Sequence, residues 1–111
     1  MSFLVRNTIS KLESGIEDAR QKVALGKSAV KICNSSEWEE LINKGYFTQE
    51  LNSLTQQLPK VTGEEKELIV GKISAIGSLK IYMENLLNQS DHAQEELKSL
   101  EEELNHQRGQ L

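Results

Sequence analysis

The stretch that decides the fold is residues 63–108, which read GEEKELIVGKISAIGSLKIYMENLLNQSDHAQEELKSLEEELNHQR. Apolar and small residues recur in it at steps of four and three, the spacing that places side chains on one side of a long α-helix. This stripe consists of Ile69, Ile73, Ile76, Leu79, Met83, Leu86, Ser90, Ala93, Leu97, Leu100 and Leu104. We therefore expect one helix over 63–108, roughly 68 Å long.

The two halves of this helix differ in their apolar content. Residues 68–87 have apolar side chains on more than one side of the helix, so we expect that half to be buried on several sides. Gly71 and Gly77 are expected there to permit close helix packing. Residues 88–108 keep only the narrow stripe and are otherwise polar, so this half needs a partner helix.

Residues 3–33 show the same periodicity from Val5 through Gly26 and Val30 to Cys33, and we expect a second long helix there. Residues 1–34 carry a charge of +3 and residues 84–111 a charge of −5, counting Lys, Arg, Asp and Glu. Opposite charges favour antiparallel pairing of the two helices, although both sets also suit solvated faces. The 111 residues fit a single domain. The predicted fold class is all-α, a long antiparallel helical hairpin or coiled coil.

Two short helices are expected between the long ones, over residues 36–58. Ser36 with Glu39 has the pattern of a capping box, which opens a helix. Lys44-Gly45 is typical of a helix C-terminus, which would leave Tyr46-Phe47 in a turn. Thr48 then begins the second short helix, and Pro59 ends it.

The C-terminal part of the long helix is our predicted contact between copies of the chain. The first helix is shorter than the last, so an antiparallel pair should leave one end of the last helix uncovered. The expected oligomerisation segment is 88–108, with Met83, Leu86, Ala93, Leu97, Leu100 and Leu104 in the interface. Leu97→Asp or Leu100→Asp should then separate the copies and leave the hairpin folded. A frayed, solvated tail is the alternative.

Three aromatic residues, Trp38, Tyr46 and Phe47, lie close together in the sequence of the short helices. They either close the open end of the hairpin or form an anchor for a partner protein, a role in which aromatic residues are enriched. Burial of these side chains against residues 69–79 would exclude the surface anchor.

Catalytic and cofactor sites are not predicted. His92 and His106 lie about 21 Å apart along one helix and cannot share a metal ion. Cys33 stands alone and closes an apolar stripe, which suits a buried structural thiol. No nucleophile–base or acid–base pair can be assembled, so we expect no enzyme, no metal and no cofactor. The net charge of −4 argues against a nucleic-acid partner. No stretch approaches the roughly 20 apolar residues of a membrane span, and residues 1–6 turn polar too early for a signal peptide.

The order Leu41-Ile42, Gly45-Tyr46-Phe47, Glu50-Leu51, followed by 73–82 (ISAIGSLKIY), resembles small α-helical proteins of tailed bacteriophages. The resemblance covers about residues 38–83 and departs from the pattern at Asn52, where a basic residue often stands. It implies a role in virion structure or assembly, in the host cytoplasm or the virion, and no catalytic residues.

Two functions follow as hypotheses. The first is a non-enzymatic, homo-oligomeric structural or assembly protein that acts through coiled-coil contacts. The alternative is a small phage-type inhibitor or adaptor that binds a host protein or sequesters a ligand.

Overall fold

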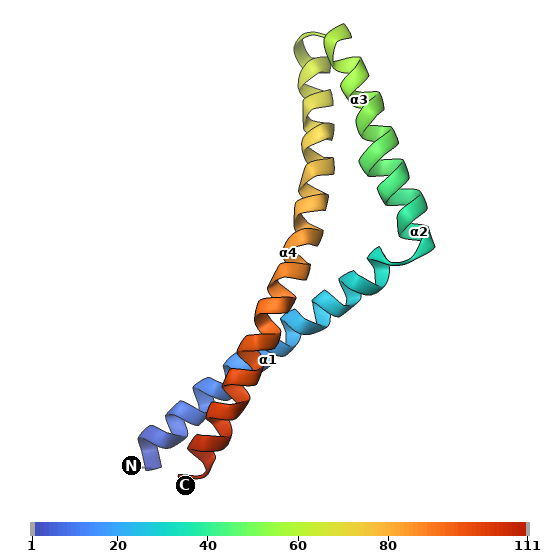
Figure 1. Ribbon diagram of the computed structural model, residues 1–111. Helices are drawn as coiled ribbons and strands as arrows, with labels where there is room; N and C mark the ends of the chain where they lie inside the picture. Colours follow the sequence, from blue (N-terminus) through green and yellow to red (C-terminus); the bar gives the residue numbers. More distant parts are fainter. Residues whose placement is uncertain (1, 111) are drawn as a thin grey trace. The chain divides into compact units, whose positions relative to one another are not determined.

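The computed structural model describes the backbone of residues 2–110 and the side chains of residues 3–110. Every element of that part of the chain is helical (Figure 1). In chain order the elements are α1 (Ser2–Cys33), α2 (Ser36–Trp38), the π-helix η1 (Glu39–Glu50), α3 (Leu51–Gln57), the 3₁₀-helix η2 (Leu58–Lys60) and α4 (Gly63–Arg108). The predicted all-α class and both predicted long helices are confirmed.

Contacts within the chain group the residues into two compact units. The terminal unit contains α1 up to Ser28 and the chain from Leu86 onwards. The central unit contains residues 29–85, which include the last turn of α1, all the short helices and the first half of α4. The chain expected to be a single domain thus has two centres of packing.

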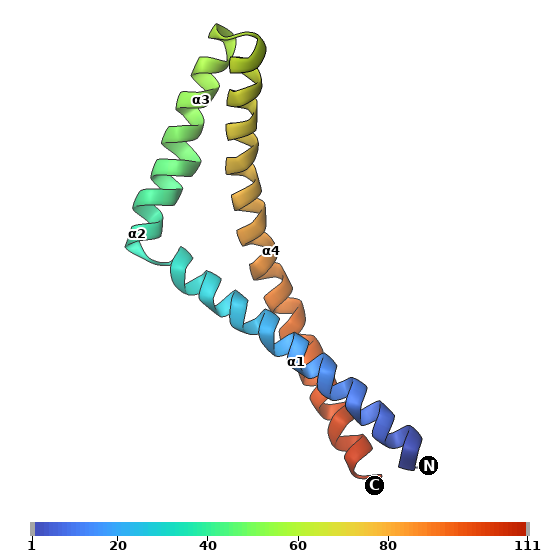
Figure 2. The ribbon, with the colours of Figure 1, turned by 180° about the vertical axis from the view of Figure 1, so that it is seen from behind.

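In the terminal unit, α1 and α4 run antiparallel. The two chain ends lie side by side in both ribbon views (Figures 1 and 2). Buried Ala19, Val23 and Ala93 form its core cluster, and Leu97 packs against them. Small residues at this contact let the two helices come close together, as in other tightly packed helix pairs. The predicted hairpin is therefore confirmed.

Gly26 is the point of closest approach in the terminal unit. A Cβ atom built on Gly26 would overlap Cβ and Oγ of Ser90, and it would lie 3.4 Å from the Leu86 carbonyl oxygen. Any side chain at position 26 would push the helices apart. This close approach explains a glycine inside a helix, where it costs about 1 kcal/mol relative to alanine.

In the central unit, the segment from η1 to η2 folds back along the first half of α4. The chain reverses direction after η2, and Gly63 has a φ of 62°, a left-handed conformation that suits glycine. The core is a cluster of buried Leu54, Ile69 and Ile76. Partly buried hydrophobic side chains pack around it: Tyr46, Phe47, Leu51, Leu58, Val61 and Ile73.

The prediction of two short helices separated by a turn at residues 44–47 is wrong. Helical structure continues from Ser36 to Lys60, and Gly45 lies inside η1. Thr48 caps no new helix, because its hydroxyl donates to the carbonyl of Asn43 (2.7 Å). The aromatic side chains that follow Gly45 pack on the core beside α4. We attribute the unbroken helix to this packing, which outweighs the low helix propensity of one glycine.

The start of this helical segment also differs from the prediction by one residue. Ser35, not Ser36, is the N-cap, and its Oγ accepts the backbone N–H of Trp38 (3.1 Å). The same hydroxyl donates to the carbonyl oxygen of Ile32 (2.6 Å). One serine thus satisfies polar groups at the end of α1 and at the start of the next helix.

Candidate interaction surface

The residues predicted to join copies of the chain are packed inside it. Ala93 is only 1% exposed and lies in the core cluster of the terminal unit, with Leu97 against it. Leu104 is buried as well. A Cβ atom built on Gly15 would lie 3.3 Å from Cδ1 of Leu100, which places that leucine against α1. The premise that this stretch of α4 is left uncovered is therefore wrong, because α1 covers it.

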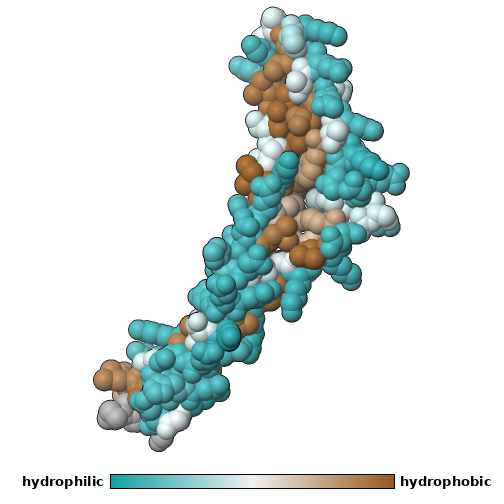
Figure 3. Space-filling model, in the orientation of Figure 1, coloured by the Kyte–Doolittle hydropathy of each residue, from teal (hydrophilic) through white to brown (hydrophobic). Residues whose placement is uncertain are grey.

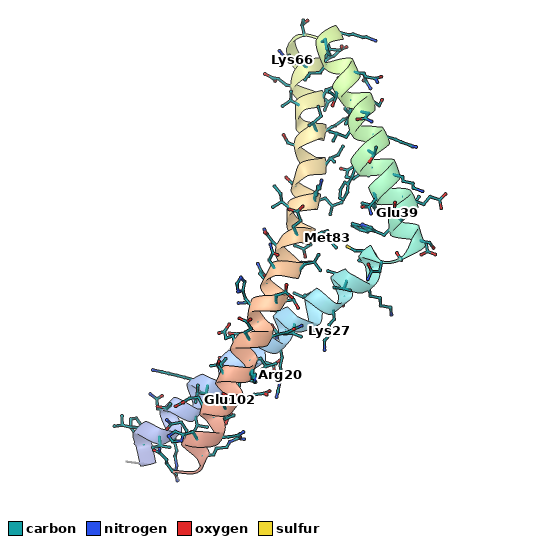
Figure 4. The ribbon with its side chains drawn as sticks, in the orientation of Figure 1. Arg20, Lys27, Glu39, Lys66, Met83 and Glu102 are labelled. Carbon is teal, nitrogen blue, oxygen red and sulfur yellow. The ribbon has the colours of Figure 1, made fainter. Side chains whose placement is uncertain are left out.

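The two remaining members of the predicted interface are half-buried. Leu86 begins the α4 part of the terminal unit, and its carbonyl oxygen faces Gly26. Met83 belongs to the central unit and lies on the first half of α4 (Figure 4). A second copy would reach the buried members of the stripe only by displacing α1. This finding argues against the expectation that Leu97→Asp leaves the hairpin folded.

The aromatic residues at the short helices form one contiguous group. The rings of Trp38 and Phe47 meet edge to face, with centroids 6.2 Å apart at 80°, and those of Tyr46 and Phe47 lie 6.1 Å apart. Tyr46 and Phe47 pack on the cluster of Leu54, Ile69 and Ile76. By the criterion stated above, both are core residues and not surface anchors, and only Trp38 remains a candidate for contact with a partner.

A small apolar hollow lies beside Trp38. Its volume is about 260 Å³, and its lining includes Ile32, Leu41 and Ile42. Leu41 is 67% exposed at its rim. The hollow is large enough for one apolar side chain of another protein, but too small for the drug-sized ligands that occupy pockets of about 300 Å³ or more.

A polar groove in the terminal unit is lined mainly by side chains that pair with each other. Its volume is about 490 Å³. Arg20 meets Glu101 across it at 3.5 Å, and Arg108 meets Glu13 at 3.5 Å. All four side chains are roughly half exposed, and exposed pairs of this kind contribute about 0–1 kcal/mol each. The groove therefore presents little uncompensated charge to a ligand.

One side of α4 in the central unit has exposed apolar residues that nothing in that unit covers. Leu68 is 61% exposed and Tyr82 57%, while Val70 and Ile81 are similarly open to solvent. We call these four residues the α4 apolar pairs, Leu68 with Tyr82 and Val70 with Ile81. The η1–α3 segment packs against Ile69, Ile73 and Ile76 and so takes a different side of the helix.

The glycines of this half of α4 also lack neighbours. A Cβ atom built on Gly71 or on Gly77 would find nothing within 4 Å. The prediction that they permit close packing beside Ser74 and Ser78 is therefore wrong within the chain. The apolar content of residues 68–87 was visible in the sequence, but the expected burial on several sides occurs on one side only.

The space-filling view agrees with this distribution of polarity. Hydrophobic surface gathers over α3 and the first half of α4, whereas the terminal unit shows mainly hydrophilic side chains (Figure 3). Isolated exposed apolar residues are common on proteins, but groups of them mark sites where other surfaces bind. The central unit is thus the part of the molecule best suited to interaction.

The other residues with potential chemistry are dispersed. His92 is exposed, His106 and Gln110 lie within hydrogen-bond distance (3.0 Å between side-chain nitrogens), and Cys33 is a half-buried free thiol. No three His, Cys, Asp or Glu side chains among the described residues come together as a metal site. In the same part of the chain, no helix has the length and apolar character needed to span a membrane.

Comparisons of the chain with known protein families, with curated proteins and with solved structures gave no match.

Proposed function

We propose that this chain is a non-enzymatic structural or assembly protein that acts as an oligomer through contacts between helices. The observation that carries the proposal is the exposure of the α4 apolar pairs in the central unit. Burial of one such side chain stabilises an interface by about 1.5–3 kcal/mol. Association of helices would remove these residues from water, and it would give the neighbour-free glycines of α4 a packing role.

The resemblance to tailed-bacteriophage proteins supports the biological setting of this proposal. It spans residues 38–83, and the α4 apolar pairs lie within this range. We therefore propose that the assembly formed is part of a virion or of its assembly pathway.

Light scattering coupled to size-exclusion chromatography tests the proposal. The account predicts a mass that is a multiple of the 12.5 kDa chain mass and that falls on dilution. A mass of one chain at every concentration, up to the millimolar range, would refute it.

The hollow beside Trp38 favours a second candidate, an adaptor that captures an apolar side chain of a host protein. Affinity capture from a bacterial extract, with Leu41→Asp as the matched variant, tests this candidate. The adaptor function predicts a captured protein that is lost with Leu41→Asp and kept with Leu68→Asp. Equal capture by both variants would exclude the hollow as the site that binds the captured protein.

A further inference from the structure

We infer that the partner of the exposed side of α4 is a second copy of this chain, bound antiparallel about a two-fold axis near residue 75. The inference rests on the proposed oligomeric function and specifies its surface. The four α4 apolar pair residues carry it, because their arrangement along the helix is self-complementary.

The helical positions of these residues fit one continuous face. Leu68 and Tyr82 are 82 − 68 = 14 residues apart, and Val70 and Ile81 are 81 − 70 = 11 apart, both close to whole numbers of turns. Leu68 and Tyr82 therefore line one edge of this side of α4, and Val70 and Ile81 line the other edge, roughly 130° away around the helix. Between the two pairs, this side carries only small residues: Gly71, Ser74, Ala75 and Ser78.

An antiparallel copy fits this pattern end to end. With the axis at residue 75, residue n of one chain lies opposite residue 150 − n of the other, so Leu68 meets Tyr82 and Val70 meets the turn that holds Ile81. The small residues meet at the centre, where backbones approach most closely. A parallel copy would instead bring Lys66 against Lys66 and Glu84 against Glu84, and juxtaposed like charges are unfavourable.

The charges beside this face have the same symmetry. Lys66 and Glu84 are 18 residues apart, which is five turns, and they lie on one edge of the face. Because 66 + 84 = 150, the antiparallel arrangement places Lys66 opposite Glu84 of the other copy twice. A two-fold interface requires this kind of self-complementarity, since the same patch supplies both sides. Figure 4 shows Lys66 near the start of α4.

The experiment measures the dissociation constant of the full-length chain and of matched variants by sedimentation equilibrium. Tyr82→Asp should weaken association about 100-fold, since the charge enters the interface twice. Leu25→Asp, at an apolar position of α1 with similar exposure, should change it by less than about threefold. Circular dichroism should show that both variants keep their helices, because both side chains are exposed.

A cysteine substitution then identifies the contact. In a Cys33→Ser background, Ser74→Cys near the axis should form a disulfide-linked dimer on mild oxidation. Gln56→Cys, exposed on α3, should not. If the chain is oligomeric but Tyr82→Asp associates like the wild type and Ser74→Cys does not cross-link, copies meet elsewhere. The inference is then overturned and the proposed oligomeric function survives. A chain that is monomeric throughout overturns both.

Discussion

Gly26 shows how one residue sets the distance between two helices. The space that a Cβ atom would need at this position is occupied by the Ser90 side chain. Gly15 also faces α4, but its nearest neighbour is the end of the flexible Leu100 side chain, at 3.3 Å. Both glycines lie on α1 and face α4. They differ in whether the neighbouring side chain on α4 can move away.

Gly26→Ala should therefore destabilise the protein, and Gly15→Ala should stabilise it slightly. At position 26, overpacking of about 1–3 kcal/mol outweighs the roughly 1 kcal/mol gained in helix propensity. At position 15, the Leu100 side chain can rotate away from the added methyl group at little cost, so most of the gain in helix propensity remains. Urea unfolding followed by circular dichroism gives both values, with Gly26→Ala plus Ser90→Gly as the rescue. A Gly26→Ala protein more stable than the wild type would contradict the close approach.

The cross-helix ion pairs of the terminal unit should matter little. Arg20 and Glu101 are 60% and 46% exposed and 3.5 Å apart, so water screens their attraction. Arg20→Ala should lower the free energy of unfolding by less than about 1 kcal/mol. Raising the salt concentration to about 1 M should remove most of that difference, because the Debye length falls to about 3 Å. A larger, salt-independent loss would mean that the side chain acts through packing.

At the scale of the element, the periodicity of α4 predicted which side of the helix is covered. Every residue of the stripe from Ile69 to Leu104 is buried or half-buried. The same reasoning failed for α1 at Val30, which is exposed while Ala29 is buried. The three-residue step from Gly26 to Ala29 keeps the buried side continuous, and apolar character alone did not distinguish the two neighbours.

The unbroken helix through Gly45 could not be predicted from local signals. Lys44-Gly45 has the composition of a helix end, and only the packing of Tyr46 and Phe47 on α4 residues distant in sequence opposes that interpretation. Similarly, the capping-box pattern of Ser36 with Glu39 favoured the wrong serine as the cap. Hydrogen bonds to Ile32 and Trp38 select Ser35.

Leu97→Asp should unfold the terminal unit, because Leu97 packs against the cluster of Ala19, Val23 and Ala93. An unpaired charge in this contact lowers the stability of the unit by several kcal/mol relative to leucine. We expect hydrogen exchange to accelerate in residues 2–28 and 86–108. Glu102→Asp on the exposed side of α4 serves as the control. A variant that keeps wild-type protection would show that α1 does not cover this residue.

Leu54→Ala should destabilise the central unit by about 2–5 kcal/mol, the usual cost of removing a buried leucine side chain. Leu54 is the buried residue through which α3 packs against Ile69 and Ile76. Leu41→Ala, at a highly exposed leucine of the same unit, should change stability by less than about 0.5 kcal/mol. Thermal unfolding monitored by near-ultraviolet circular dichroism of Trp38 and the tyrosines measures both. Equal losses of stability in the two variants would contradict the assignment of Leu54 to the core.

At the scale of the whole molecule, the sequence predicted the hairpin, but it assigned the expected contact between copies to a stretch of α4 that α1 covers. Residues 68–87 and 88–108 both have apolar stripes, and periodicity does not say which helix of the chain covers which stripe. α1 covers the narrow stripe of residues 88–108. Residues 68–87, in contrast, have more apolar side chains than η1 and α3 cover. The apolar residues that the chain itself leaves exposed are the observation from which we propose an interface.

Distances between spin labels on two copies test most directly whether this side of α4 joins them. Labels would replace Ser74 or Glu67, one at a time, in a Cys33→Ser background. The antiparallel contact predicts backbones about 10 Å apart at position 74 and about 26 Å apart at position 67, from a rise of 1.5 Å per residue and helix axes about 9 Å apart. Equal short distances at both positions, or no distance between copies at either, would contradict the account.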